Sequence, residues 1–182
     1  MTNEAPRPLE SFIDRETLLK RPHTNSVAVD PRSPLEIDDA ISLEPIDREK
    51  KEYRVAVHIA DAGLLLGHTD IIDGAREQGW TQYDFRDTSK SVPMLPEIVY
   101  KRALGLDSPV SEGAPAIEVA FDFDLTSRAI GNISLRKTRV QLKKYSYREH
   151  DKAISDPTDK NEHEDALERL MVARRLFAPP NR

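Results

Sequence analysis

Apolar and polar residues alternate along several parts of this chain, which is the pattern of strands that bury one face. The clearest case is residues 117–125, where five apolar side chains share one face. A turn at 126–129 then leads into a long, basic strand, so these two segments are expected to pair as a hairpin. The strands expected from the pattern cover residues 26–30, 40–43, 53–59, 117–125 and 130–145.

The helical signals lie around these strands and are short. Helices are expected over residues 11–20, 70–78, 96–104, 147–154 and 161–177. Gly79 is placed to end the second helix, and Pro96 suits the first turn of the third. The stretch 80–96 has no helical period, so we expect an extended or looped segment with Trp80 packed in the core. Together these elements predict an α+β fold, with a mixed, mostly antiparallel sheet and helices on one side.

The chain is expected to divide into three parts. Residues 1–22 are rich in proline and charge, which predicts an N-terminal tail with at most one short helix. Residues 23–155 contain every expected strand and are assigned to one folded domain. Residues 156–182 are expected to form a linker, a helix and a C-terminal tail.

Composition narrows the function classes. The chain has 182 residues and no cysteine, which excludes disulfides, thiolate metal sites and cysteine nucleophiles. It has neither an apolar run long enough for a membrane span nor an N-terminal signal, so we expect a cytoplasmic protein with no membrane partner. The formal net charge is -5, which a purely electrostatic nucleic-acid binder would seldom have.

The charges are unevenly placed along the chain. Residues 30–39 hold four acids, Asp30, Glu36, Asp38 and Asp39, against one arginine. Residues 134–150 hold six basic side chains against one acid. This suits an enzyme that holds metal in one place and phosphates in another, although two differently charged solvent faces would give the same pattern. Among the basic residues we favour Lys137, Arg139 and Lys143 for contacts with a phosphate backbone.

The four acids lie between apolar, strand-like flanks, where clustered negative charge destabilises a fold unless a cation offsets it. An all-oxygen ligand set favours a hard ion such as Mg²⁺ or Mn²⁺. Two such ions can activate water for phosphodiester hydrolysis. From spacing alone, an ordinary acidic loop or a weak Ca²⁺ site that only orders the turn fits equally well.

Five motifs occur in the same order as in the ribonuclease II/ribonuclease R family (the RNB catalytic domain), which the chain therefore resembles. This resemblance favours a metal site over an ordinary acidic loop. The resemblance covers about residues 23–177. The motifs are the acids Asp30, Glu36, Asp38 and Asp39, then Val57-His-Ile-Ala-Asp61, the segment 73–83, Val92-Pro-Met-Leu-Pro96 and the segment 142–147.

The resemblance implies a metal-dependent 3′→5′ exoribonuclease that acts on single-stranded RNA and releases nucleoside 5′-monophosphates. The four acids would be its metal-centred, catalytic carboxylates. Tyr83 and Tyr147 match positions whose rings pack against terminal nucleotides, and stacking on aromatic rings needs no base preference. Without the resemblance, ordinary half-buried packing would be the better reading of both tyrosines.

The match departs from the family in three ways, and the first is that Ala114-Pro115 stands where the family usually has an arginine before a strand. Glu36 stands where the family has aspartate, and its extra methylene moves the carboxylate by about 1.5 Å. The family's catalytic domain is also longer, so we expect the chain to form only the N-terminal half of the RNB fold and to need a partner chain or another copy of itself. The alternative function is therefore a catalytically inactive, truncated RNB-like module that binds RNA or protein.

Other motifs add little. His58 lies on the strand face opposite Val55 and Val57, and we expect a hydrogen-bonded structural histidine in preference to a general base. The sequence has neither a glycine-rich phosphate loop nor a G-x-S-x-G motif, so nucleotide-motor and serine-hydrolase functions have no support.

Overall fold

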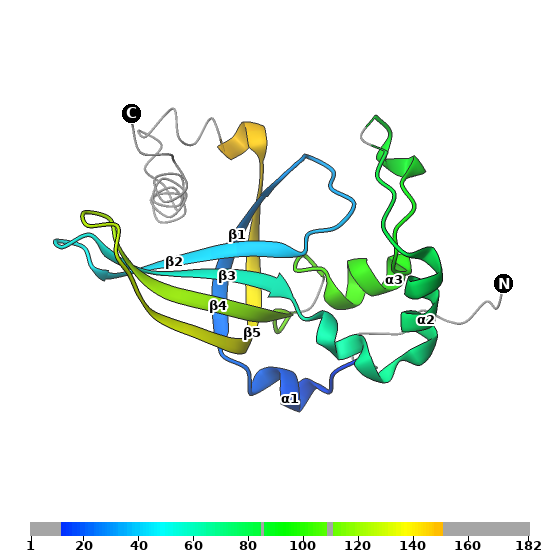
Figure 1. Cartoon of the computed structure of the whole chain (residues 1–182), viewed down its shortest axis with the longest axis horizontal. Coiled ribbons are helices and arrows are strands. Elements are labelled where there is room, and N and C mark those ends of the chain that lie inside the picture. Colours follow the sequence, from blue (N-terminus) through cyan, green and yellow to red (C-terminus); the bar gives the residue numbers. More distant parts are fainter. Residues whose placement is uncertain (1–11, 85, 109–110, 151–182) are drawn as a thin grey trace.

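Five strands close into a small barrel in the computed structural model of the chain (Figure 1). The structure describes residues 12–84, 86–108 and 111–150. The strands are β1 (His23–Asp30), β2 (Asp39–Asp47), β3 (Glu52–Ala60), β4 (Ala114–Asp124) and β5 (Ile130–Ser146). Strands and helices occur together and the sheet is mixed, which confirms the expected α+β class.

One parallel pairing closes the barrel. Each strand from β1 to β5 is antiparallel to the next, but β1 also lies parallel to β5, from His23 opposite Arg139 to Asp30 opposite Ser146. β5 is long enough to pair with β4 along its first part and with β1 along its second (Figure 1). The start of the acidic segment, Asp30, therefore lies beside the end of the basic strand.

Most of the helices lie toward one end of the barrel, and residues 147–150 form a further helical turn directly after β5 (Figure 1). The other helices are α1 (Arg15–Leu19), the 3-10 helix η2 (Ala62–Gly67), α2 (Thr69–Gln78), the 3-10 turn η3 (Thr88–Lys90), α3 (Glu97–Val99) and the π-helix η4 (Tyr100–Leu104). α2 ends at Gly79, as expected, because its φ of 80° is a conformation that glycine adopts at little cost. The third expected helix is confirmed as α3 continued by η4.

Some expected elements lie outside the described residues. These are the segment 1–11, the end of the helix expected at 147–154, and the linker, helix and tail of 156–182. Within the described ranges, none of the helices has the length and apolar character that crossing a bilayer requires.

The closed part of the barrel is packed with small side chains. Ala28, Ala40, Ala116 and Val140 form one buried cluster, which Ile37 completes from outside the strands. Toward the end of β3, Ala56 and His58 are buried on one face, whereas Ile59 on the other face is 50% exposed. The larger apolar side chains therefore lie partly on the outer surface.

A polar network crosses this interior. The Nε2 atom of His58 lies 2.8 Å from the Ser42 hydroxyl, and its Nδ1 atom lies 3.8 Å from Glu118 Oε2. Arg136 donates to both Glu118 oxygens, at 2.6 and 3.2 Å. Burial lowers the pKa of His58, against the opposing effect of Glu118. His58 is thus confirmed as a hydrogen-bonded structural histidine that links β2 to β4.

A second buried ion pair anchors the chain just before β1. Arg21 Nη1 lies 2.8 Å from Asp61 Oδ2, and both side chains are almost fully buried. Lys137 Nζ lies 3.9 Å from the same oxygen, but the lysine side chain is 63% exposed. Arg21 comes before the expected start of the domain at residue 23, yet it belongs to the buried core.

We predict that Arg21→Met lowers the free energy of unfolding by about 3 kcal/mol, because it leaves the Asp61 carboxylate buried without its partner. Lys137→Met should cost less than about 1 kcal/mol, since an exposed lysine is well solvated. Urea unfolding followed by circular dichroism measures both. Equal costs for the two variants would show that the buried pair does not anchor β1.

Candidate active site at the acidic loop

The acidic loop, residues 31–38, connects β1 to β2 and is flanked by Asp30 and Asp39 at the strand ends. Ile37 fixes it: this side chain is 1% exposed, and its carbonyl accepts a 2.8 Å hydrogen bond from the N–H of Leu106. The carbonyl of Asp38 accepts another, also 2.8 Å, from Ala60 at the end of β3. The loop is thereby held at one end of the barrel while the Asp38 and Asp39 side chains stay exposed.

Three of the four predicted acids interact electrostatically. Burial raises the pKa of the Asp30 carboxyl, and the negative charges of Asp39 and then Asp38 raise it further. Lys144 opposes this shift. Because like charges raise a carboxyl pKa only when they are near, Asp38 and Asp39 lie close enough to Asp30 for their charges to act on it.

Glu36, the fourth predicted acid, is hydrogen-bonded to Tyr83. The phenol of Tyr83 donates a 2.5 Å hydrogen bond to Glu36 Oε1. This bond, followed by burial, raises the pKa of Tyr83 to about 12. Tyr83 belongs to the arm, which we define as residues 80–84 and 86–96 and which stands beside α2 and α3 (Figure 1). Glu36 is therefore tied to the arm.

The donor set partly fits a divalent cation. Its ligand atoms are all oxygens, and the mutual repulsion around Asp30 is the kind that a hard cation relieves. Among the residues that the structure describes, however, no three histidine, aspartate or glutamate side chains come together closely enough to hold a metal ion. The chemistry fits Mg²⁺ or Mn²⁺, but the ligand arrangement is not assembled.

The two halves of the arm are joined by one isolated β-bridge. Gln82 and Val92 exchange backbone hydrogen bonds of 2.8 and 2.9 Å. Trp80, at the base of the arm, is 67% exposed, so the expectation that it packs in the core is wrong. Thr81 and Met94 line a cavity of about 220 Å³ that Glu36 and Asp38 border from the loop. Mostly apolar side chains form the rest of that cavity.

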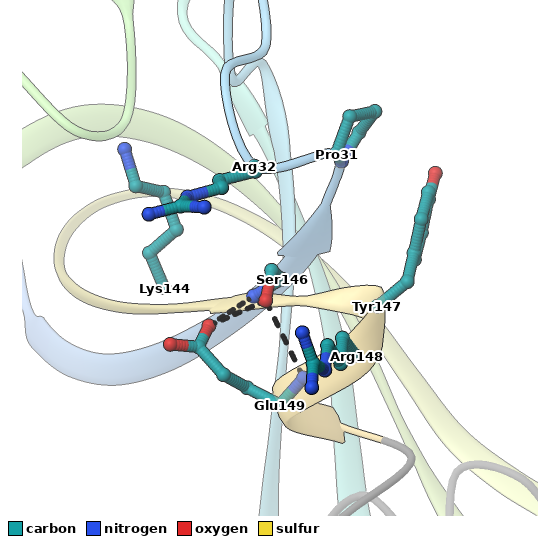
Figure 2. Close-up of a pocket in the computed structure, with 7 residues that line it drawn as sticks. All are labelled: Pro31, Arg32, Lys144, Ser146, Tyr147, Arg148 and Glu149. Atoms are coloured by element: carbon teal, nitrogen blue, oxygen red, sulfur yellow. Dashed lines mark hydrogen bonds between the residues drawn. The ribbon is translucent and has the colours of Figure 1, made fainter.

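A second cavity, of about 720 Å³, lies on the other flank of the loop and is rich in cations (Figure 2). It is lined by Pro31, Arg32, Lys144, Ser146, Tyr147, Arg148 and Glu149. Glu149 is occupied by Ser146, whose N–H and hydroxyl each donate to it at 2.7 Å. These bonds lower the pKa of Glu149, and Arg32 lowers it further. Lys144 also lies 3.2 Å from Asp107.

The sequence-based choice of basic residues selected one strand face. Lys137, Arg139 and Lys143 share that face of β5, whereas Lys144 lies on the other. The guanidinium of Arg139 donates to the backbone carbonyls of Arg21 and Glu112. Lys143 Nζ lies 5.6 Å from the centre of the Tyr145 ring.

The sequence-based choice missed three cations beside the loop: Arg32, Lys144 and Arg148 line one cavity there, and the charge of Lys144 acts on Asp30. The alternation along β5 was the available signal, but only the pairing of Asp30 with Ser146 shows which face meets the acids. The two predicted tyrosines flank the loop, Tyr83 from the arm and Tyr147 from the cation-rich cavity, with exposed fractions of 50% and 57%.

Comparisons with known proteins point to one family. The family described as the RNB domain matches residues 21–178. The chain is similar to DIS3-like exonuclease 2 of Schizosaccharomyces pombe, with 28% identity over 138 residues that cover 74% of this chain and 14% of that protein. The chain thus spans a small part of this curated relative.

Solved structures share the fold. Mycoplasma genitalium RNase R, solved in complex with double-stranded RNA, matches with a TM-score of 0.75 and 23% identity, over 90% of this chain and 29% of that one. An active-site mutant of the Dss1 exoribonuclease from Candida glabrata matches with a TM-score of 0.71 and 21% identity, over 86% of this chain and 22% of that one. Yeast Ssd1, described as a pseudonuclease, matches with a TM-score of 0.66 and 14% identity, over 89% of this chain and 19% of that one.

We predict that Asp39→Asn lowers the pKa of Asp30 and stabilises the metal-free protein. A raised carboxyl pKa means that the folded state binds more protons than the unfolded state. Stability from Asp30 is therefore fully present below about pH 3.9 and is lost as the pH rises through its folded-state pKa. The Asp39→Asn variant should lose less of this stability than the unmodified chain, so its melting temperature should be about 1–2 °C higher at neutral pH.

Thermal unfolding in the presence of a chelator, between about pH 4 and 7, tests this prediction. Glu49→Gln is the matched control, because Glu49 is an exposed acid in the turn between β2 and β3. If both variants melt alike at every pH, the repulsion among the loop acids is negligible.

Proposed function

Because the chain belongs to the RNB domain family, which matches residues 21–178, we propose that its acidic loop provides metal-binding carboxylates of an exoribonuclease site. The reaction is metal-dependent 3′→5′ hydrolysis of single-stranded RNA, with release of nucleoside 5′-monophosphates. The similar proteins include a named exonuclease and a named exoribonuclease, which supports the exoribonuclease class of activity. The chain covers 14% of one named exonuclease and 29% of one RNase R, so activity of this chain by itself is part of the proposal.

The observation that carries the proposal is the repulsion among Asp30, Asp38 and Asp39. A fold keeps like charges together at a cost, and a cation that binds there offsets that cost. A bound Mg²⁺ or Mn²⁺ would supply the positive charge that activates water and stabilises the leaving oxygen of a phosphodiester. Asp30, Glu36, Asp38 and Asp39 would hold it, and the bond from Tyr83 engages one oxygen of the Glu36 carboxylate.

RNA would lie along the cation-rich flank of the loop. Arg32, Lys144 and Arg148 would contact phosphate oxygens, because they line one cavity next to the acids. The exposed rings of Tyr83 and Tyr147 would stack on bases.

A second row of phosphate contacts would follow β5. Lys137, Arg139 and Lys143 share one strand face, which suits a backbone that runs along the strand. Arg139 would contribute least, since its guanidinium already serves two backbone carbonyls.

The second candidate is an RNB-like module that binds RNA without cleaving it. Two observations favour it: Glu36 is bound to Tyr83, and in the described part of the chain no three acids or histidines converge as metal ligands. The similar yeast Ssd1 is itself described as a pseudonuclease. Both candidates use the same RNA-binding surface, so they differ only in chemistry.

A partner chain or a second copy would complete the domain. Ile59, Val119 and Leu135 lie on β3, β4 and β5 and are 50%, 38% and 71% exposed. Val119 pairs directly with Leu135, so their side chains share one apolar sheet face. Apolar faces of this kind are typical of surfaces that further protein covers. We propose that association occurs there.

We expect the purified chain with Mg²⁺ to shorten a 5′-labelled single-stranded RNA from its 3′ end. Asp38→Asn should abolish shortening but retain RNA, because it removes a ligand charge without touching the cation-rich cavity. Asp73→Asn is the control, since this exposed acid on α2 is paired with Arg76. Denaturing gels measure shortening, and filter binding measures retention. Retention without shortening in the unmodified chain supports the second candidate, and the absence of both contradicts each candidate.

We also expect Mg²⁺ or Mn²⁺ to raise the melting temperature. A ligand that binds only the folded state stabilises it by about 1.4 kcal/mol at ten times its Kd. Asp38→Asn should lose most of the shift and Glu49→Gln should keep it, and a chelator should reverse it. If millimolar metal does not change the melting temperature of the folded protein, the proposed metal site is contradicted, whatever the RNA assay gives.

A further inference from the structure

The last strand of the barrel passes directly into a helical turn at the cation-rich cavity. Residues 146–149 read Ser-Tyr-Arg-Glu, and a serine followed three residues later by a glutamate is the sequence signature of a capping box at a helix start. We propose that Glu149 is a positioning residue for RNA binding, which directs Tyr147 and Arg148 into the cavity through its contacts with Ser146. The inference rests on the proposed RNA-binding function and needs no metal at the acidic loop.

The capping box is complete in both directions. The N–H and the hydroxyl of Ser146 each donate to Glu149 Oε2 at 2.7 Å, and the N–H of Glu149 donates to the Ser146 hydroxyl oxygen at 3.3 Å. Figure 2 shows the Glu149 carboxylate turned back to Ser146, with Tyr147 and Arg148 projecting from the turn between them. Two residues of the cavity wall are therefore carried by a turn that the other two close.

The capping box also sets the place where the strand ends. Ser146 is the last residue of β5, and it pairs with Asp30, the last residue of β1. A carboxylate that accepts from the Ser146 N–H stabilises the change from extended to helical backbone at this residue. The two residues that follow thus leave the strand in a defined direction, beside Pro31 and Arg32.

Tyr147 and Arg148 depend on this turn for their direction. Both side chains are exposed, and within the described ranges neither side chain makes a hydrogen bond or an ion pair. Their direction is therefore set by the backbone that carries them. The same freedom makes them available to a ligand, because the ring can stack on a base and the guanidinium can contact a phosphate.

Glu149 has a second effect, which opposes the first. The other charged residues that line the cavity, Arg32, Lys144 and Arg148, are cations. The bonds from Ser146, followed by the charge of Arg32, lower the pKa of Glu149, so its carboxylate is ionised at neutral pH. This negative charge repels a phosphate that approaches the cavity. The structural contacts of Glu149 therefore explain an acid in this place, whereas attraction for RNA does not.

Two substitutions of Glu149 separate these effects, because both remove the charge and only one removes the capping box. Glutamine keeps the box, since its amide oxygen also accepts from the Ser146 N–H. Glu149→Gln should bind single-stranded RNA about two to five times more tightly than the unmodified chain, as expected for loss of one exposed like charge. Glu149→Ala should bind about ten times more weakly than Glu149→Gln, because the stacking ring loses its orientation. Filter binding at one fixed salt concentration measures both.

Glu49→Gln and Glu49→Ala are the matched control pair, because Glu49 is an exposed acid in the turn between β2 and β3. Both should bind RNA as the unmodified chain does, and melting curves check that each variant is folded. Adding Tyr147→Leu and Arg148→Met to both Glu149 variants should abolish the difference between them. Equal RNA affinity of Glu149→Ala and Glu149→Gln would overturn the positioning role and leave the RNA surface intact. No retention of RNA by the unmodified chain would overturn both.

Discussion

The parallel pairing of β1 with β5 is the constraint on which the rest of this molecule depends. It joins the first strand to the last and sets the register in which Asp30 faces Ser146. Parallel pairs need a long connection, and here that connection is the remainder of the sheet together with all but the first of the helices. Because of this closure, an acidic segment near residue 35 and a basic segment near residue 145 become one surface with charges of both signs.

The inside of the barrel explains how such a closure is stabilised. Small side chains allow the strands to approach closely, and the network of Ser42, His58, Glu118 and Arg136 connects four consecutive strands. Buried polar groups are costly unless they are satisfied, so they favour one register over its neighbours. The ion pair between Arg21 and Asp61 adds the same kind of specificity where the chain enters β1.

Local patterns predicted the elements well, and long-range closure explains what they missed. Alternation located the strands, and a glycine in the left-handed region ended α2 at Gly79. Alternation divides each strand into two faces but does not show which face points into the barrel. It therefore could not show that the small, polar face would be the inner one, or that Lys144 faces the acids. Nothing in the local sequence brings Tyr83 to Glu36, because that contact requires the arm and the loop to meet in space. The prediction that Trp80 is buried was wrong for the same reason, because the position of the arm in space is not visible in the local sequence.

The exposed position of Trp80 has a practical consequence for anyone who studies this protein in solution. It is the sole indole in the chain and stands at the base of the arm, away from the packed barrel. Its emission is therefore already that of a solvated fluorophore in the native state, and unfolding of the strands should change its colour little. Tryptophan fluorescence therefore reports on the base of the arm and changes little when the barrel unfolds.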